Sequence, residues 1–165
     1  MSHDLDKHIR KEILIGSLSN IFFNGLIAWW LLKDKGDLHL WGETGFAVDI
    51  AATGFILPLI VGLIVISIHR SKVRKGKMPA VPGQDQQLWG RFPFSVFFSS
   101  AIFGLIGLFL IAPITIGVFI GLNIDQVSPI NYSIFKGLWA GVIVAILAGP
   151  MVKVGLRRAN TAEVN

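Results

Sequence analysis

Two ionisable residues interrupt apolar stretches of the chain, and they are the side chains best placed for chemistry. Asp49 precedes Arg70 by 21 residues, and Lys136 precedes Arg157 by 21 residues. At 1.5 Å per helical residue, both distances are about 31 Å, close to the thickness of the hydrocarbon core of a bilayer. With the arginines at one interface, we expect both charges near the other. There they either form an ion pair or face headgroup water separately.

A second polar feature precedes them in the chain. Ser17, Asn20 and Asn24 are three or four residues apart, so a helix places them on one face. In hydrocarbon such a face should turn inward. The favoured interpretation is interhelical hydrogen bonding, worth about 0.6 kcal/mol per bond in measured membrane cases. The alternative is a polar lining for a substrate or ion path.

Motifs for catalysis or cofactor binding are missing from the sequence. There is no cysteine, and no nucleotide-binding, zinc-protease or hydrolase motif occurs. Asp37, His39 and Glu43 lack a metal-binding spacing, which favours a solvated loop. His69 is interpreted as a cation suited to a helix carboxyl terminus. The sequence therefore predicts no enzyme, no cofactor and no metal.

The elements that must position these residues are membrane helices. The chain is 53% hydrophobic and 15% charged, and its mean hydropathy is +0.65. A helix of about 20 apolar residues crosses the hydrocarbon core, and four stretches qualify: 13–32, 46–68, 94–122 and 132–152. They predict an all-α integral membrane protein with one four-helix domain over residues 1–165, and no strands. The first run exceeds the roughly 7–15 residues of a signal-peptide core, so it should stay uncleaved.

The distribution of charge predicts the orientation. Twelve of the 15 Lys and Arg residues lie in the amino-terminal tail, the 69–93 loop or the carboxyl-terminal tail. Because basic residues favour the cytoplasmic side, both termini should be cytoplasmic. The net charge of +5 thus reflects topology, and we expect no nucleic-acid partner. The layout is typical of small multi-spanning proteins of the bacterial cytoplasmic (inner) membrane.

The basic loop could also bind lipid. A cluster of cations beside a membrane attracts anionic headgroups, although topology setting alone could explain it. The predicted contacts are Arg70, Lys72, Arg74, Lys75 and Lys77.

Small residues recur every four positions in three stretches, a pattern that lets membrane helices pack closely. They are Gly54 and Gly62 in the second stretch, Gly117 and Gly121 in the third, and Gly137, Gly141 and Gly149 in the fourth. Their partner can be the same chain, a second copy or another protein. Pro58 should kink the second helix, and the long third stretch, which carries Pro113, should be tilted, kinked or end in an irregular turn.

The two halves of the chain could be a repeat. A shift of 87 residues lays the second stretch on the fourth, matching Gly54 to Gly141 and Arg70 to Arg157. Two hairpins related in this way would share one orientation in the membrane. Chance matching of apolar segments is the alternative.

Two functions fit these features. The first is a non-enzymatic accessory or structural subunit that packs against itself or a larger membrane complex, and it rests on the glycine ridges and missing motifs. The alternative is a small homo-oligomeric transporter or channel, and it rests on Asn20, Asn24, Asp49, Lys136 and the proline at position 58.

Overall fold

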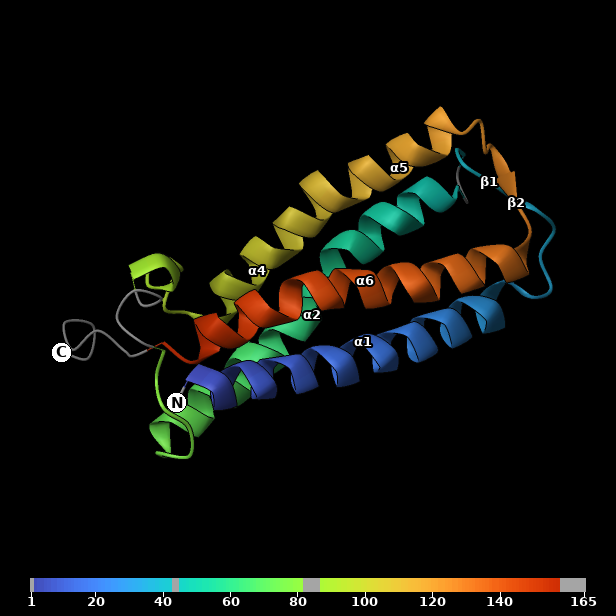
Figure 1. Ribbon diagram of the computed structural model, residues 1–165. Helices are drawn as coiled ribbons and strands as arrows, with labels where there is room; N and C mark the ends of the chain where they lie inside the picture. The colour runs from blue at the N-terminus through green and yellow to red at the C-terminus, as the bar shows by residue number, and fades with distance from the viewer. Residues whose placement is uncertain (1, 43–44, 82–86, 158–165) are drawn as a thin grey trace.

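The computed structural model describes residues 2–42, 45–81 and 87–157 and is mainly helical (Figure 1). Its elements are α1 (Ser2–Leu32), β1 (Leu38–His39), α2 (Phe46–Arg74), α4 (Val96–Ile106), a π-helical segment η1 (Gly107–Ile111), α5 (Ala112–Gly121), β2 (Gln126–Val127) and α6 (Pro129–Gly155). In this part of the chain, four helical spans are long and apolar enough to cross a membrane. They include the four predicted stretches nearly completely. Glu43 and Arg158 lie outside the described residues.

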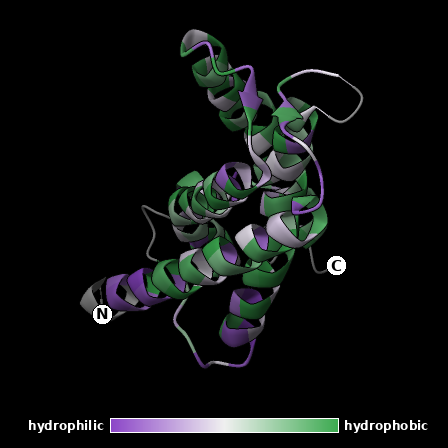
Figure 2. Cartoon of the chain, turned by 90° about the vertical axis from the view of Figure 1, so that its right-hand side faces the viewer, coloured by the Kyte–Doolittle hydropathy of each residue, from purple (hydrophilic) through white to green (hydrophobic). Residues whose placement is uncertain are grey.

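The first helix begins much earlier than the apolar run. α1 starts at Ser2, so the polar residues before position 13 continue the same helix. Figure 2 shows its first turns as hydrophilic and most of its remaining length as hydrophobic. A helix does not end at the hydrocarbon boundary if its backbone hydrogen bonds continue. The extra turns carry His8 and Glu12 toward α2.

The third span is irregular just before Pro113, in a form that the sequence did not predict. It changes from α-helix to π-helix at η1, where Ala112 N–H donates to the carbonyl of Gly107, five residues earlier. Pro113 then lies in the first turn of α5. A proline has no N–H to donate, and wider hydrogen bonding before it accommodates the loss. α2, in contrast, continues through Pro58, whose ring is buried.

α1 and α2 have different main packing partners in the bundle. α1 lies along α6, whereas α2 packs against α4, η1, α5 and α6. Among the described residues, α1 and α2 have little backbone contact with each other. In the apolar windows, 61% of α6 is buried but only 6% of α1. α6 is therefore central, and α1 is a peripheral helix held mainly from one side.

Five of the seven predicted packing glycines lie against other helices of the same chain. The closest contact joins Gly54 to Gly107, where a Cβ on Gly107 would lie 1.8 Å from the Gly54 carbonyl oxygen. Gly62 faces Ser100, and Gly137 and Gly141 face Ile21 of α1. Gly149 lies at an ordinary contact distance from α1.

Gly117 and Gly121 differ from the other five glycines. Neither would bring a Cβ within 4 Å of another helix of the described chain. Helix packing at these two positions therefore remains a prediction about contacts with another molecule.

The prediction of no strands is wrong at one place. Leu38–His39 pairs antiparallel with Gln126–Val127, with Leu38 opposite Val127. Leu40 N–H also donates to the Asp125 carbonyl at 2.8 Å. Strands of two residues are too short to show alternating hydropathy. They form because two loops leave the same end of the bundle, opposite the start of α1 (Figure 1).

Candidate functional site

Asp49 and Lys136 meet at the end of the bundle that carries the strands. Lys136 Nζ lies 2.7 Å from Asp49 Oδ1 and 2.6 Å from Asp49 Oδ2. The Tyr132 hydroxyl, one helical turn before Lys136, also donates to Asp49 Oδ2. Asp49 occupies the first turn of α2, where the helix dipole favours a carboxylate. Three polar side chains from two helices thus share one site.

Two cavities extend from this ion pair. One, of about 400 Å³, is lined by the end of α1, the start of α2, Tyr132 and Lys136. The other, of about 410 Å³, lies between α1 and α2 and is lined by Asn20, Asn24 and residues 49–64 of α2. Asp49 and Ala52 line both cavities. We call the two together the α1–α2 groove.

The asparagines line the groove, but among the described residues they do not form the interhelical hydrogen bonds that the sequence favoured. Asn20 Nδ2 donates to the Gly16 carbonyl at 2.8 Å. Asn24 Nδ2 lies 3.1 Å from the Asn20 carbonyl and 3.2 Å from Asn20 Oδ1. Ser17 Oγ is buried without a partner among the described residues. Because α2 does not pack closely against this face, the amides bond within α1.

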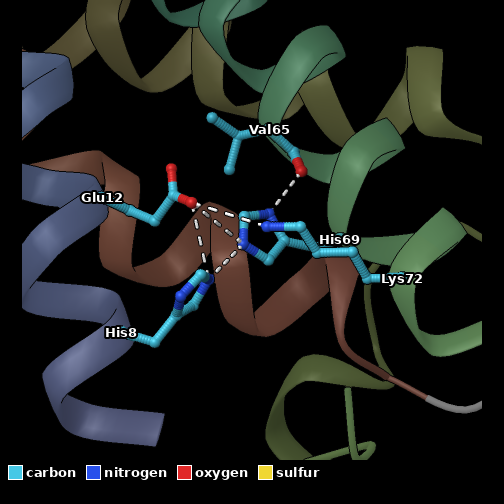
Figure 3. A network of polar contacts seen from close by, with 5 residues as sticks. All are labelled: His8, Glu12, Val65, His69 and Lys72. Carbon is cyan, nitrogen blue, oxygen red and sulfur yellow. Dashed lines mark hydrogen bonds and ion pairs between the residues drawn. The ribbon is translucent and has the colours of Figure 1, made fainter. Parts of the chain in front are cut away.

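A second polar cluster lies at the opposite end of the groove-forming helices, near the start of α1 and the end of α2; Figure 3 shows its side chains. His8 and Glu12, one turn apart on α1, point toward His69 and Lys72 of α2. His8 Nε2 lies 3.0 Å from His69 Nε2 and 3.5 Å from Glu12 Oε1. Glu12 Oε1 lies 3.9 Å from His69 Nε2 and 3.7 Å from Lys72 Nζ. This arrangement offers three metal-ligating atoms within 4.8 Å of one another.

Sequence reasoning missed this cluster. It interpreted His69 as a cation at a helix end, whereas the side chain is only 1% exposed and contacts His8. The spacing of His8 and Glu12 was a usable signal, since residues four apart share a helix face. Residues 1–12 are too polar to count as part of a membrane span, which hides the fact that they continue the helix. The partner on α2, 61 residues away from His8, depends on helix packing.

The predicted lipid-binding residues divide into two groups. The guanidinium of Arg70 donates to the Phe94 carbonyl and lies 4.5 Å from the Phe94 ring centroid. Lys72 lies beside Glu12. The remaining three side chains, Arg74, Lys75 and Lys77, are exposed, and their contact with anionic headgroups stays a prediction.

Arg157, at the same end of the bundle, is 4% exposed. It donates to the carbonyls of Trp89, Phe92 and Pro93, so it ties the end of α6 to the segment before α4.

Comparisons with known protein families, with curated proteins and with solved structures gave no significant match.

Proposed function

We propose that this chain is a non-enzymatic subunit of a larger complex in the bacterial cytoplasmic membrane, and that its α1–α2 groove receives a transmembrane helix of a partner. One observation carries the proposal. Two long apolar helices run beside each other with little backbone contact, and polar side chains line part of the space between them. In a bilayer such a groove is filled either by lipid chains or by side chains of another helix.

Polar residues favour a protein occupant over lipid chains. Lipid tails offer Asn20 and Asn24 no hydrogen-bond partner, whereas a polar residue on a partner helix does. The amide donors bond within α1, but the Asn24 side-chain oxygen has acceptor capacity to share.

The surface of α1 suits contact with another transmembrane helix. It is held on one side by α6, and its other faces expose large apolar side chains such as Leu18, Phe22 and Ile27. These faces suit both lipid and a neighbouring helix, so they allow a partner to cover the groove and the outer side of α1 together.

The second candidate function is a small homo-oligomeric transporter or channel. The position of Asp49 favours this second function, because the Asp49 carboxylate lines both cavities and its side chain is 42% exposed in the ion pair. Ionisable residues inside membrane spans often mark ion or substrate paths. In this case the groove would be closed by a second copy and would conduct along Asn20, Asn24 and Asp49.

The proposal includes an orientation with both termini in the cytoplasm. The start of α1 and the end of α6 lie at one end of the bundle, as an even number of crossings requires (Figure 1). The exposed cations Arg74, Lys75 and Lys77 lie at the end of α2 and just beyond it. Excess positive charge favours the cytoplasmic side.

We also propose that two helical hairpins, α1 with α2 and the third span with α6, form a repeat. α1 packs on α6 just as the third span packs on α2, and α2 packs on α6 between them. Exchanging the hairpins preserves this pattern. The reciprocal pairing of Leu38 with Val127 and of His39 with Gln126 is preserved as well, if residues 38 and 39 correspond to 126 and 127.

Site-specific photo-crosslinking in native membranes tests the groove. A photoreactive residue at Ala52 or Ile60 samples the groove, and one at Ile114, exposed on α5, is the matched control. The proposal expects one heterologous protein from both groove positions and not from position 114, with a lower yield in Asn24→Leu. Adducts of twice the chain mass would favour the homo-oligomer. Lipid adducts alone at both groove positions would contradict both functions.

A further inference from the structure

We propose that His8, Glu12 and His69 form a binding site for one divalent transition-metal ion of the Zn²⁺ type, at the end of the bundle where α1 begins. The inference stands apart from the function proposed for the groove. It rests on the geometry of three side chains, the hydrogen bonding of a buried imidazole and the charge beside them.

The spacing of the ligand atoms suits a tetrahedral ion. With metal–ligand bonds of 2.0–2.1 Å, two ligand atoms of a tetrahedral zinc site are about 3.3–3.4 Å apart. The three separations here are 3.0, 3.5 and 3.9 Å, on both sides of that value. Small rotations of His8 and Glu12 would bring all three separations closer to that value. Both side chains are partly exposed, at 26% and 36%, so they have room to move.

His69 is already oriented as a ligand. Its Nδ1 lies 2.8 Å from the Val65 carbonyl oxygen, which can only accept a hydrogen bond. Nδ1 therefore carries the hydrogen, and Nε2 presents a lone pair toward His8 and Glu12. A ligating histidine usually donates its other ring N–H to a carbonyl or carboxylate in this way. With the ring only 1% exposed, its position is held by packing as well.

His8 must change tautomer when the ion binds. In the absence of metal, His8 Nε2–H donates to His69 Nε2, because that atom is an acceptor. Coordination through His8 Nε2 requires the hydrogen to move to Nδ1 by exchange with water, or to leave. The exposed edge of His8 gives water the access that this exchange needs.

Two imidazole nitrogens and one carboxylate oxygen form a ligand set that suits Zn²⁺ and related borderline ions. Three protein ligands leave a fourth position for water or another ligand. Lys72 Nζ, 3.7 Å from Glu12 Oε1, balances the carboxylate when no metal is bound. An ammonium so close repels a divalent cation, so Lys72 should weaken the site and turn away when it fills.

The site would join helices that otherwise have little contact. His8 and Glu12 belong to the early turns of α1, and His69 to the last turns of α2. A bound ion would hold these ends together at the boundary of the apolar core. Binding to the folded state alone should raise the melting temperature.

The experiment uses the full chain without an affinity tag in mild detergent. Equilibrium dialysis against Zn²⁺ followed by elemental analysis should give one ion per chain. His8→Gln should weaken binding at least about tenfold, whereas Lys72→Gln should tighten it. His39→Gln, at an exposed residue of β1, is the matched control and should leave affinity unchanged.

Folding is checked separately from binding. Each variant should keep its helical circular dichroism without metal, and Zn²⁺ should raise the melting temperature of the wild type but not of His8→Gln. If His8→Gln does not fold, Glu12→Gln replaces it. Less than half an ion per chain, or equal affinity of the wild type and the folded ligand variant, would overturn the site.

Discussion

Asp49 and Lys136 are 87 residues apart in the sequence, yet Lys136 Nζ lies 2.6 Å from Asp49 Oδ2. The lysine side chain is only 15% exposed, so its charge depends on this partner more than a surface cation would. The pair joins α2 to the central helix at the rim of the α1–α2 groove.

Removing only the carboxylate should therefore be worse than removing both charges. Asp49→Asn strands Lys136 and should lower the free energy of unfolding more than Asp49→Asn combined with Lys136→Gln. A double-mutant cycle should give a coupling of about 0.5–3 kcal/mol. Lys35→Gln, an exposed cation lining the same cavity, is the control. The measurement is reversible unfolding in detergent, and a coupling near zero would contradict a stabilising ion pair.

The contact between Gly54 and Gly107 predicts a sharp difference between glycines of the third span. Gly107→Ala would place a Cβ 1.8 Å from a backbone oxygen, so we expect a loss of about 1–3 kcal/mol in unfolding free energy. Gly117→Ala, in open space, should be neutral or stabilising by up to about 1 kcal/mol, because alanine favours helix. Thermal melting in detergent compares the two, and equal melting temperatures would contradict the close contact.

The α1–α6 interface predicts an order among the glycines of α6. A Cβ on Gly141 would lie 2.3 Å from Ile21 Cγ1, whereas one on Gly149 would meet α1 no closer than 3.7 Å. Gly141→Ala should therefore lower the melting temperature more than Gly149→Ala. The double variant Gly141→Ala with Ile21→Ala should recover part of the loss expected from the two single changes, because alanine at position 21 lacks the Cγ1 and Cδ1 atoms that the added methyl would meet. No recovery would show that the cost arises elsewhere.

The proposed orientation predicts the side of each loop. Reporters fused after Gly76 or at the carboxyl terminus should report cytoplasm, and reporters after Gly36 or Gln126 should report the opposite side. Reporter activity and protease protection in intact cells measure this. A carboxyl terminus on the outer side would require an odd number of crossings and would contradict four spans.

Much of the helical layout could be predicted from the sequence. Apolar runs of bilayer length identified the four spans, since hydrocarbon forces each segment to satisfy its own backbone hydrogen bonds. The equal spacing of Asp49 and Lys136 from Arg70 and Arg157 predicted a common depth. It left open whether the two charges pair, because depth along a helix says nothing about which side of the helix faces a neighbour.

Around Pro113 the sequence again predicted an effect but not the structural form that it takes. The missing N–H predicted an irregular third span, but three forms of irregularity were equally compatible with the sequence. The fit of Gly107 against Gly54 accompanies the π-helical segment that the structure contains. Short antiparallel pairing between residues 38–39 and 126–127 had no sequence signal at all.

The sequence by itself thus determined the order and approximate extent of four helices that are long and apolar enough to cross a membrane, because hydropathy and helix rise act along the chain. Only the tertiary structure decided that His8 and Glu12 meet His69, that α1 stands apart from α2, and that Gly117 has no neighbour in the described chain. The reason is that lateral contacts depend on how each helix is rotated and where it crosses its neighbours. Those quantities are set by the fit of whole helix surfaces, and no single segment contains them.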